Sequence, residues 1–355
     1  MKYFQKLILL GIIIFTPLFS QSIEIPHRMM HQDTTYNVPI FIYDVTDLES
    51  IQLKIEYDHE IVIAESIIEN PLGVLGSNYT YTTNISSPGE IELAIGSNSA
   101  NLFTGNGMVA QIKFNSLGHL GDFSPISILD AQINSNWQVS AVDGSIEIVL
   151  SSLTITGQDN LENGAFHSII LGMCNGCTDS WKFGEDEYDY PNPVSGDYTN
   201  INFHHLDWYG LEDANGNTCD QIDFATDFRK QHSFRELTSW GIKGSIGGDI
   251  PLDTPVNIIW DSGILLSSST NFKIFIFVGE TKYNMQELNT ISISQSELDL
   301  IENEPNIWVK MGGCAETGET QIYYRDFDGD GLGSSLQGEF CLGFQILYPN
   351  LNFLF

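Results

Sequence analysis

Short apolar runs that alternate with polar residues recur between Thr35 and Leu150. Successive side chains of a strand point to opposite faces, so this alternation predicts short β-strands. The predicted strands are residues 38–45, 51–57, 90–95, 108–114, 124–128 and 144–150. Turn-forming residues such as Gly105-Asn106-Gly107 separate them, and no stretch has helical periodicity. Strands at this spacing predict an antiparallel β-sandwich.

The pattern continues in the second half of the chain, which begins with a run of predicted turns. The predicted strands there are residues 168–172, 199–203, 256–260, 271–278, 290–294 and 306–311, with loops dominating residues 179–218. After Cys314 the composition shifts towards Gly and Asp. We therefore predict an all-β protein with a first sandwich at residues 23–150, a second at residues 151–312 and an Asp/Gly-rich tail at residues 313–355.

Five segments of the first half resemble those of bacterial cohesin domains. They are Val38-x-Ile40-x-Ile42, Ile51-x-Leu53-x-Ile55-x-Tyr57-Asp58, Pro88-Gly89-Glu90-Ile91, Gly107-Met108-Val109-Ala110-Gln111-Ile112-Lys113-Phe114 and Asp143-Gly144-Ser145-Ile146-Glu147-Ile148. The resemblance covers about residues 33–150 and implies a nine-stranded jelly roll related to carbohydrate-binding sandwich modules. It also implies docking of a dockerin module in assemblies that degrade polysaccharides, and it does not indicate which face binds.

The second half carries a looser resemblance. The strand Val256-Asn-Ile-Ile-Trp-Asp261, followed by the apolar run at residues 272–278, is similar to immunoglobulin-like sandwich modules near the C-termini of large secreted bacterial proteins. This resemblance implies a second β-sandwich and assigns no site.

The charge of the chain excludes some partners. There are 14 Lys and Arg residues against 46 Asp and Glu, and the formal net charge is −32. Contacts to nucleic-acid phosphates require clusters of Lys and Arg, so nucleic-acid binding is not expected. Anionic membrane surfaces would repel the chain, whereas divalent cations would be attracted.

The first 22 residues have the pattern of a signal peptide. Lys2 and Lys6 precede an apolar run at residues 7–19, and Ser20-Gln21-Ser22 is small and polar. The run is shorter than the about 20 residues that span a bilayer, so we expect cleavage and export without membrane insertion. The expected location is extracellular or the cell surface, with the periplasm as an alternative.

Cysteines in an exported chain favour disulfides over thiol chemistry. Cys314 and Cys341 flank the acidic tail loop, where a disulfide between them would hold the loop's ends together. The pairing of Cys174, Cys177 and Cys219 stays open, with one thiol left free or bonded to another chain. Cys174-Asn-Gly-Cys177 lies in a loop-like context, which argues against a redox motif.

The strongest local signal for a ligand is Asp326-Phe327-Asp328-Gly329-Asp330-Gly331. Alternate carboxylates followed by Gly begin an EF-type calcium loop, in which Leu332 would add its backbone carbonyl and Ser334 its side chain. The twelfth position is Gln337 rather than the expected Glu. With Tyr323-Tyr324 before it and a Cys after it, the segment resembles thrombospondin type 3 repeats and secreted bacterial Asp-rich repeats. We predict a structural calcium ion here.

A weaker candidate cation loop uses the same spacing with amides in place of two carboxylates. Its candidate ligands are Asp213, Asn215, Asn217 and Asp220. The alternative is a simple turn, because Asn-Gly sequences favour turns.

The motifs of common catalytic sites do not occur. There is no Gly-x-Ser-x-Gly elbow, His-Glu-x-x-His or phosphate-binding loop. The candidate residues for stacking on sugar rings are Trp181, Tyr188, Tyr190 and Trp208, with burial in the core as the alternative. We expect a non-catalytic exported adaptor that docks a protein module or a glycan. The alternatives are a carbohydrate-binding protein and a hydrolase with an unrecognised site.

Overall fold

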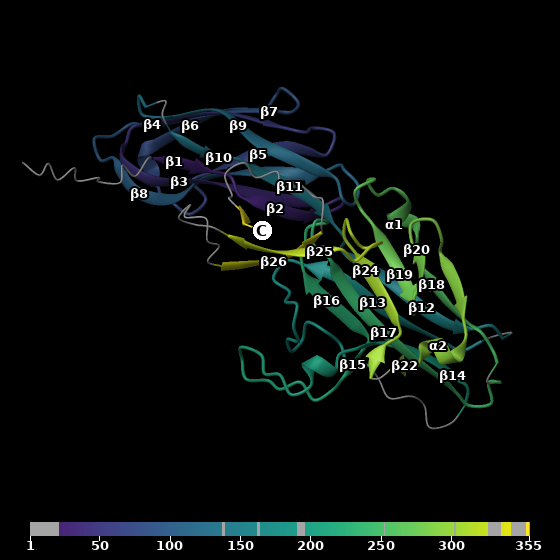
Figure 1. Cartoon of the computed structure of the whole chain (residues 1–355). Coiled ribbons are helices and arrows are strands. Elements are labelled where there is room, and N and C mark those ends of the chain that lie inside the picture. The colour runs from purple at the N-terminus through teal and green to yellow at the C-terminus, as the bar shows by residue number, and fades with distance from the viewer. Residues whose placement is uncertain are drawn as a thin grey trace, which may run out of the picture.

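The computed structural model describes residues 21–136, 139–161, 164–189, 196–251, 253–301, 303–325, 335–341 and 353–354. Strands account for most of this chain. The helices α1 (Gly263–Leu266) and α2 (Gln295–Leu298) and the 3-10 turns η1 (Gly76–Asn78) and η2 (Leu206–Trp208) are short. The predicted all-β fold is confirmed, and Figure 1 shows its strands gathered into two sandwiches.

The first sandwich consists of two sheets. Sheet A has the order β10 (Ser140–Val142), β1 (Ser22–Glu24), β3 (Thr35–Leu48), β8 (Phe103–Ser116), β5 (Val62–Glu69). Sheet B has the order β2 (His27–His31), β11 (Gly144–Val149), β9 (Phe123–Ile133), β4 (Ser50–Tyr57), β7 (Glu90–Ser97), β6 (Tyr79–Asn84). Ile40, Ile55 and Phe114 are among the fully buried residues of its core.

Two continuous segments of this sandwich contribute to both sheets. β1 and β2 are separated only by Ile25-Pro26, and β10 and β11 only by Asp143. Each segment starts in sheet A and continues in sheet B, where β2 and β11 pair in parallel. Proline cannot donate to a ladder, which accounts for the interruption at Pro26. Counting each segment once reduces the eleven described strands of this sandwich to nine, the number that the sequence resemblance implies.

The second sandwich also has two sheets. Sheet C has the order β16 (Thr226–Lys230), β13 (Phe166–Cys174), β12 (Ser152–Asp159), β18 (Val256–Trp260), β21 (Thr290–Ile293). Sheet D has the order β15 (Asp223–Phe224), β14 (Tyr198–His204), β17 (Thr238–Gly247), β24 (Ile307–Met311), β19 (Ile274–Val278), β20 (Thr281–Asn284). A small ribbon joins β22 (Leu300–Ile301) to β23 (Glu304–Pro305).

Every predicted strand overlaps an observed one, but the prediction of turns directly after Leu150 is wrong. β12 occupies that segment and pairs with both β13 and β18. A Cβ atom at Gly157 of β12 would lie 2.6 Å from Ile201, so glycine there permits close approach of the two sheets.

The two sandwiches share packed surface. Leu120, Val149 and Leu150 belong by sequence to the first, but they are buried in the core of the second. Ser269 N donates to Leu120 O at 2.7 Å. Gly121 has a φ of +79°, and a Cβ atom there would lie 2.6 Å from Phe272 Cβ. A side chain at Gly121 would therefore force the sandwiches apart.

The described part of the tail forms a small sheet of β26 (Ser335–Cys341), β25 (Thr320–Arg325) and β27 (Phe353–Leu354). β25 and β26 are drawn in yellow in Figure 1, below β2 in this view. The Cys314–Cys341 disulfide is present, and Cys341 N donates to Arg235 O at 2.6 Å. Among the described residues, no helix is long and apolar enough to cross a membrane.

Candidate functional site

The outward face of sheet B is the first candidate, and we call it the sheet-B face. Cross-strand pairing aligns its residues in rows over β6, β7, β4 and β9. One row is Thr82, Ala94, Gln52 and Gln132, and the next is Asn84, Glu92, Lys54 and Asp130. Most of these side chains are exposed and small or polar, so the face is open to a partner.

The charge of this face is mainly negative. Lys54 lies between Glu92 and Asp130 in its row, and its Nζ is 3.4 Å from Glu90 Oε2. The outward positions of sheet A differ, because Pro39 is buried and Phe41 is half-buried. The sheet-B face is therefore the more accessible of the two.

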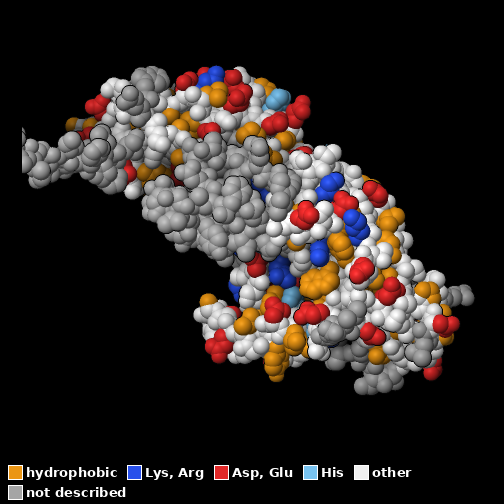
Figure 2. Space-filling view, in the orientation of Figure 1, with side chains coloured by type: hydrophobic (Ala, Val, Ile, Leu, Met, Phe, Trp, Pro, Cys, Tyr) orange, Lys and Arg blue, Asp and Glu red, His pale blue; other side chains and the backbone are white. Residues whose placement is uncertain are grey.

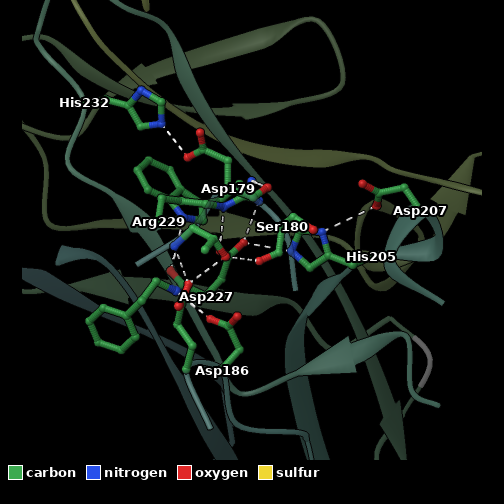
Figure 3. Close-up of polar contacts among 12 residues, drawn as sticks. Asp179, Ser180, Asp186, His205, Asp207, Asp227, Arg229 and His232 are labelled. Carbon is green, nitrogen blue, oxygen red and sulfur yellow. Dashed lines mark hydrogen bonds and ion pairs between the residues drawn. The ribbon is translucent and has the colours of Figure 1, made fainter. Parts of the chain in front are cut away.

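A network of charged side chains in the second sandwich is the other candidate, and we call it the Asp227 network (Figure 3). Asp227, on β16, is fully buried. Its Oδ1 accepts from Arg229 Nε at 2.6 Å, and its Oδ2 accepts from Arg229 Nη2 at 2.9 Å. Burial alone would raise the pKa of Asp227, but Arg229 and His205 outweigh it and hold that pKa below its usual value. Asp227 is therefore an ionised group that lies between Arg229 and His205.

His205 bridges this network to the surface. Its Nε2 lies 2.8 Å from Asp227 Oδ2, and its Nδ1 lies 3.6 Å from Asp207 Oδ1. The ring stacks on Trp208 with centroids 3.6 Å apart. Burial lowers the pKa of His205, but the hydrogen bonds that its ring donates to Asp207 and Asp227 outweigh burial and raise that pKa. Both ring nitrogens face carboxylates, so His205 is not free to act as a general base.

A second histidine extends the network, as Figure 3 shows. His232 Nε2 lies 2.5 Å from Asp179 Oδ1, and its Nδ1 lies 2.6 Å from Glu236 Oε2. Burial lowers the pKa of His232, but the two carboxylates outweigh it and raise that pKa to about 8. This imidazole is therefore largely protonated at neutral pH.

The loop before β14 covers the open edge of β16 and completes the network. Asp186 Oδ1 accepts from Phe228 N at 2.8 Å, and Ala225 N donates to Glu187 O at 2.8 Å. Burial raises the pKa of Asp186 to about 7. Covering an edge strand in this way prevents it from pairing with another chain.

A cavity of about 420 Å³ opens beside the network. Its walls include His205, Asp207, Arg229, Glu304 and Trp308. Of the residues that line it, His205, Asp207 and Arg229 are already paired within the network, which joins the end of β14 to β16 and to the 178–189 loop. The geometry is that of a structural network with a polar cavity beside it.

The prediction of sugar stacking is wrong for two residues, because both are buried. Trp181 and Trp208 are 4% and 2% exposed and belong to the core, so neither ring presents a face to a glycan. Tyr188 is half-buried against Phe224, and Tyr190 lies outside the described residues. Among the described residues, the large exposed rings are Phe166, Phe183 and Tyr209. Sequence reasoning missed them, because exposure is set by packing rather than by residue type.

The weaker candidate cation loop forms a simple turn, which is the alternative interpretation of its sequence. Asp213 Oδ1 accepts from the backbone N–H groups of Asn215 and Asn217, both at 2.9 Å. Asp213 Oδ2 accepts from Asn217 Nδ2 at 2.9 Å. Within the described residues, no group of three or more His, Cys, Asp or Glu side chains could hold a metal ion. The main predicted calcium ligands, Asp326, Asp328, Asp330, Leu332 and Ser334, lie outside the described residues.

The cysteines leave one thiol unpaired. Cys174 and Cys177 form a disulfide, as do Cys314 and Cys341. Cys219 is free and buried, and burial raises the pKa of its thiol. A buried thiol of raised pKa is a poor nucleophile, so Cys219 has the properties of a core residue.

The Asp227 network was also missed in the sequence. Its one visible signal is the concentration of basic residues in Arg229-Lys230-Gln231-His232 in a chain so poor in them. Figure 2 shows that Lys and Arg on the face in view gather mostly over the second sandwich.

Comparison with known proteins gives a likeness to cohesins over part of the chain. No family model and no curated protein matches the sequence. The third cohesin of ScaC from Acetivibrio cellulolyticus, solved with a ScaB dockerin, is 18% identical, and the match covers 36% of this chain and 99% of that one with a TM-score of 0.33. A non-cellulosomal cohesin from Archaeoglobus fulgidus is 19% identical (37% and 91% covered, TM-score 0.32). The seventh ScaB cohesin from Pseudobacteroides cellulosolvens is 14% identical (37% and 92% covered, TM-score 0.32).

Proposed function

We propose that this chain is an exported adaptor whose first sandwich docks a protein module through the sheet-B face. The observation that carries the proposal is the face itself, which presents rows of small and polar side chains over β6, β7, β4 and β9. The cohesin-like segments at residues 38–58, 88–91, 107–114 and 143–148 support the same function, because their resemblance implies a dockerin-like partner.

The charge of the face sets an expectation for the partner. Glu56, Glu90, Glu92 and Asp130 outnumber Lys54 on the sheet-B face. A partner with basic side chains would complement it and would associate faster at low ionic strength.

The remaining parts of the proposal concern location and the tail. The pattern of residues 1–22 supports export, and the setting would be extracellular polysaccharide breakdown. The acidic loop at residues 326–334 would bind a structural calcium ion, since its oxygen-bearing residues are of the kind that hard cations prefer.

The test is binding of dockerin modules to the immobilised full chain, measured by surface plasmon resonance. Ala94 is exposed in the middle of the sheet-B face, so Ala94→Arg should weaken docking at least tenfold by steric exclusion. The matched control is Thr35→Arg, because Thr35 is exposed on β3 in sheet A. Equal binding by the two variants would contradict the proposed face.

A parallel column of immobilised polysaccharide tests the glycan alternative with the same proteins. Retention on the polysaccharide without binding to any module would replace the docking proposal with carbohydrate binding. Tyr209, which is 63% exposed, is the aromatic ring to substitute in that case.

A further inference from the structure

A groove between the two sandwiches is separate from both candidate sites. Its volume is about 250 Å³. The first sandwich contributes Arg28 from β2 and Tyr36 from β3, and the second contributes Asn175, Lys230 and Gln231. The groove therefore exists only when the two sandwiches are packed together.

The described lining of this groove contains basic residues and no acidic ones, which is unusual in so acidic a chain. Asp and Glu outnumber Lys and Arg by 46 to 14 in the sequence, yet no Asp or Glu is among the described residues that line the groove. Arg28 and Lys230 are both present. The Nζ of Lys230 is 2.8 Å from Asp179 Oδ2, so its charge is already balanced.

Arg28 is the cation whose charge is not balanced. Its Nε is shut off from solvent and has no hydrogen-bond partner, and no ion pair joins Arg28 to any described carboxylate. Arg229 shows the usual arrangement, with two of its nitrogens on Asp227. Arg28 lines the groove and has no carboxylate partner among the described residues, so an anionic acceptor from outside the chain would supply its missing counter-charge.

The other groups in the groove suit a ligand larger than a single ion. The volume would hold about eight water molecules at about 30 Å³ each. Asn175 and Gln231 offer side-chain amides that can bond to hydroxyl groups, and Met29 and Tyr36 offer apolar surface. His27 also lines the groove, where burial and the neighbouring Arg235 and Arg28 lower its pKa to about 4. Its imidazole is therefore neutral at pH 7 and adds no second cation.

We propose that the groove binds an oxyanion on the guanidinium of Arg28, as the carboxylate or sulfate group of an acidic sugar. A guanidinium matches the geometry of such groups with two parallel hydrogen bonds. The amides and the apolar wall would hold the sugar ring. This proposal does not depend on docking at the sheet-B face.

The experiment is calorimetric titration of the full chain with glucuronate, glucose, sodium sulfate and sodium phosphate at constant ionic strength. Wild type should bind glucuronate and not glucose, and Arg28→Gln should weaken glucuronate binding at least tenfold. The matched control is Lys113→Gln, because Lys113 pairs with Glu65 in sheet A and should leave binding unchanged. Thermal unfolding of both variants checks that they remain folded.

The four ligands distinguish the source of the oxyanion. Tighter binding of glucuronate than of sulfate or phosphate supports an acidic sugar. Binding of the inorganic ions alone, lost in Arg28→Gln, supports the oxyanion site with a free ion as its source. Equal affinities in wild type and Arg28→Gln, or no binding of any oxyanion to wild type, would overturn the proposal.

Discussion

The two sandwiches are built on similar pairs of sheets but bury different chemistry. Among the described residues, the buried polar side chains of the first are three serines and Glu147, and Glu147 accepts from Ser233 and Phe234 of the second. The second buries the Asp227 network, together with His204 and two asparagines of β14. The first therefore depends on apolar packing, whereas the second depends also on paired charges that respond to pH.

Removing the charge of Asp227 should cause the largest loss of stability, and it tests directly whether the second sandwich depends on paired charges. Asp227→Asn leaves Arg229 and His205 buried without their counter-charge, which should destabilise the second sandwich by about 3–5 kcal/mol. Denaturation followed by tryptophan fluorescence measures this, because five of the six tryptophans lie in residues 151–312. Asp130→Asn, on the exposed face of β9, is the control. A shift below about 0.5 kcal/mol for Asp227→Asn would break the comparison.

Shortening an apolar side chain in the core of the first sandwich tests whether that sandwich depends on apolar packing alone. Ile112 is fully buried in the first core, and Ile112→Ala should cost about 2–5 kcal/mol through lost contacts and a cavity. Since no charge is involved, the loss should be the same at pH 6 and pH 9. Hydrogen exchange resolved by peptide should show it first in residues 21–150. A loss that varies strongly with pH would contradict an apolar origin.

The titration of His232 should give a smaller effect, confined to the second sandwich. Its pKa is raised from 6.5 to about 8, so its stabilising contribution is complete below pH 6.5 and is lost as pH rises through 8. The expected loss between pH 6 and pH 9 is about 2 kcal/mol. His232→Gln should remove this part of the pH dependence, so the difference between wild type and variant isolates it. Parallel pH profiles for the two proteins would refute the assignment.

Calcium should give the smallest effect, and it should spare both sandwiches. If residues 326–334 bind calcium, a free calcium concentration of ten times the dissociation constant should stabilise the tail by about 1.4 kcal/mol. Asp328→Ala should abolish that gain, since Asp328 is the central of the three predicted carboxylate ligands. Protease resistance of the C-terminal third measures the effect. Equal protection of wild type and Asp326→Ala/Asp328→Ala would mean that the acidic loop is only a solvated turn.

Periodicity predicted the fold far better than it predicted the candidate sites. Strands such as β4 and β8 alternate apolar and polar residues because one face packs on a core, and that alternation is visible in the sequence. The Asp227 network is not visible in this way, since Asp179, His205 and Asp227 come from three separate segments. Trp208 is another case, because it is buried against Phe224 of β15, with ring centroids 5.2 Å apart. Pairings between distant segments leave no local pattern.

The Cys314–Cys341 disulfide has a mechanical consequence. A pulling force applied to the chain after Cys341 would pass through the covalent bridge to Cys314, so the residues between them would carry no tension. The load would enter next to Arg235, whose carbonyl accepts from Cys341 N and whose guanidinium lies 4.9 Å from the Phe123 ring centroid of the first sandwich. Tension on the tail would thus be carried by the junction of the two sandwiches, while the acidic loop stayed slack.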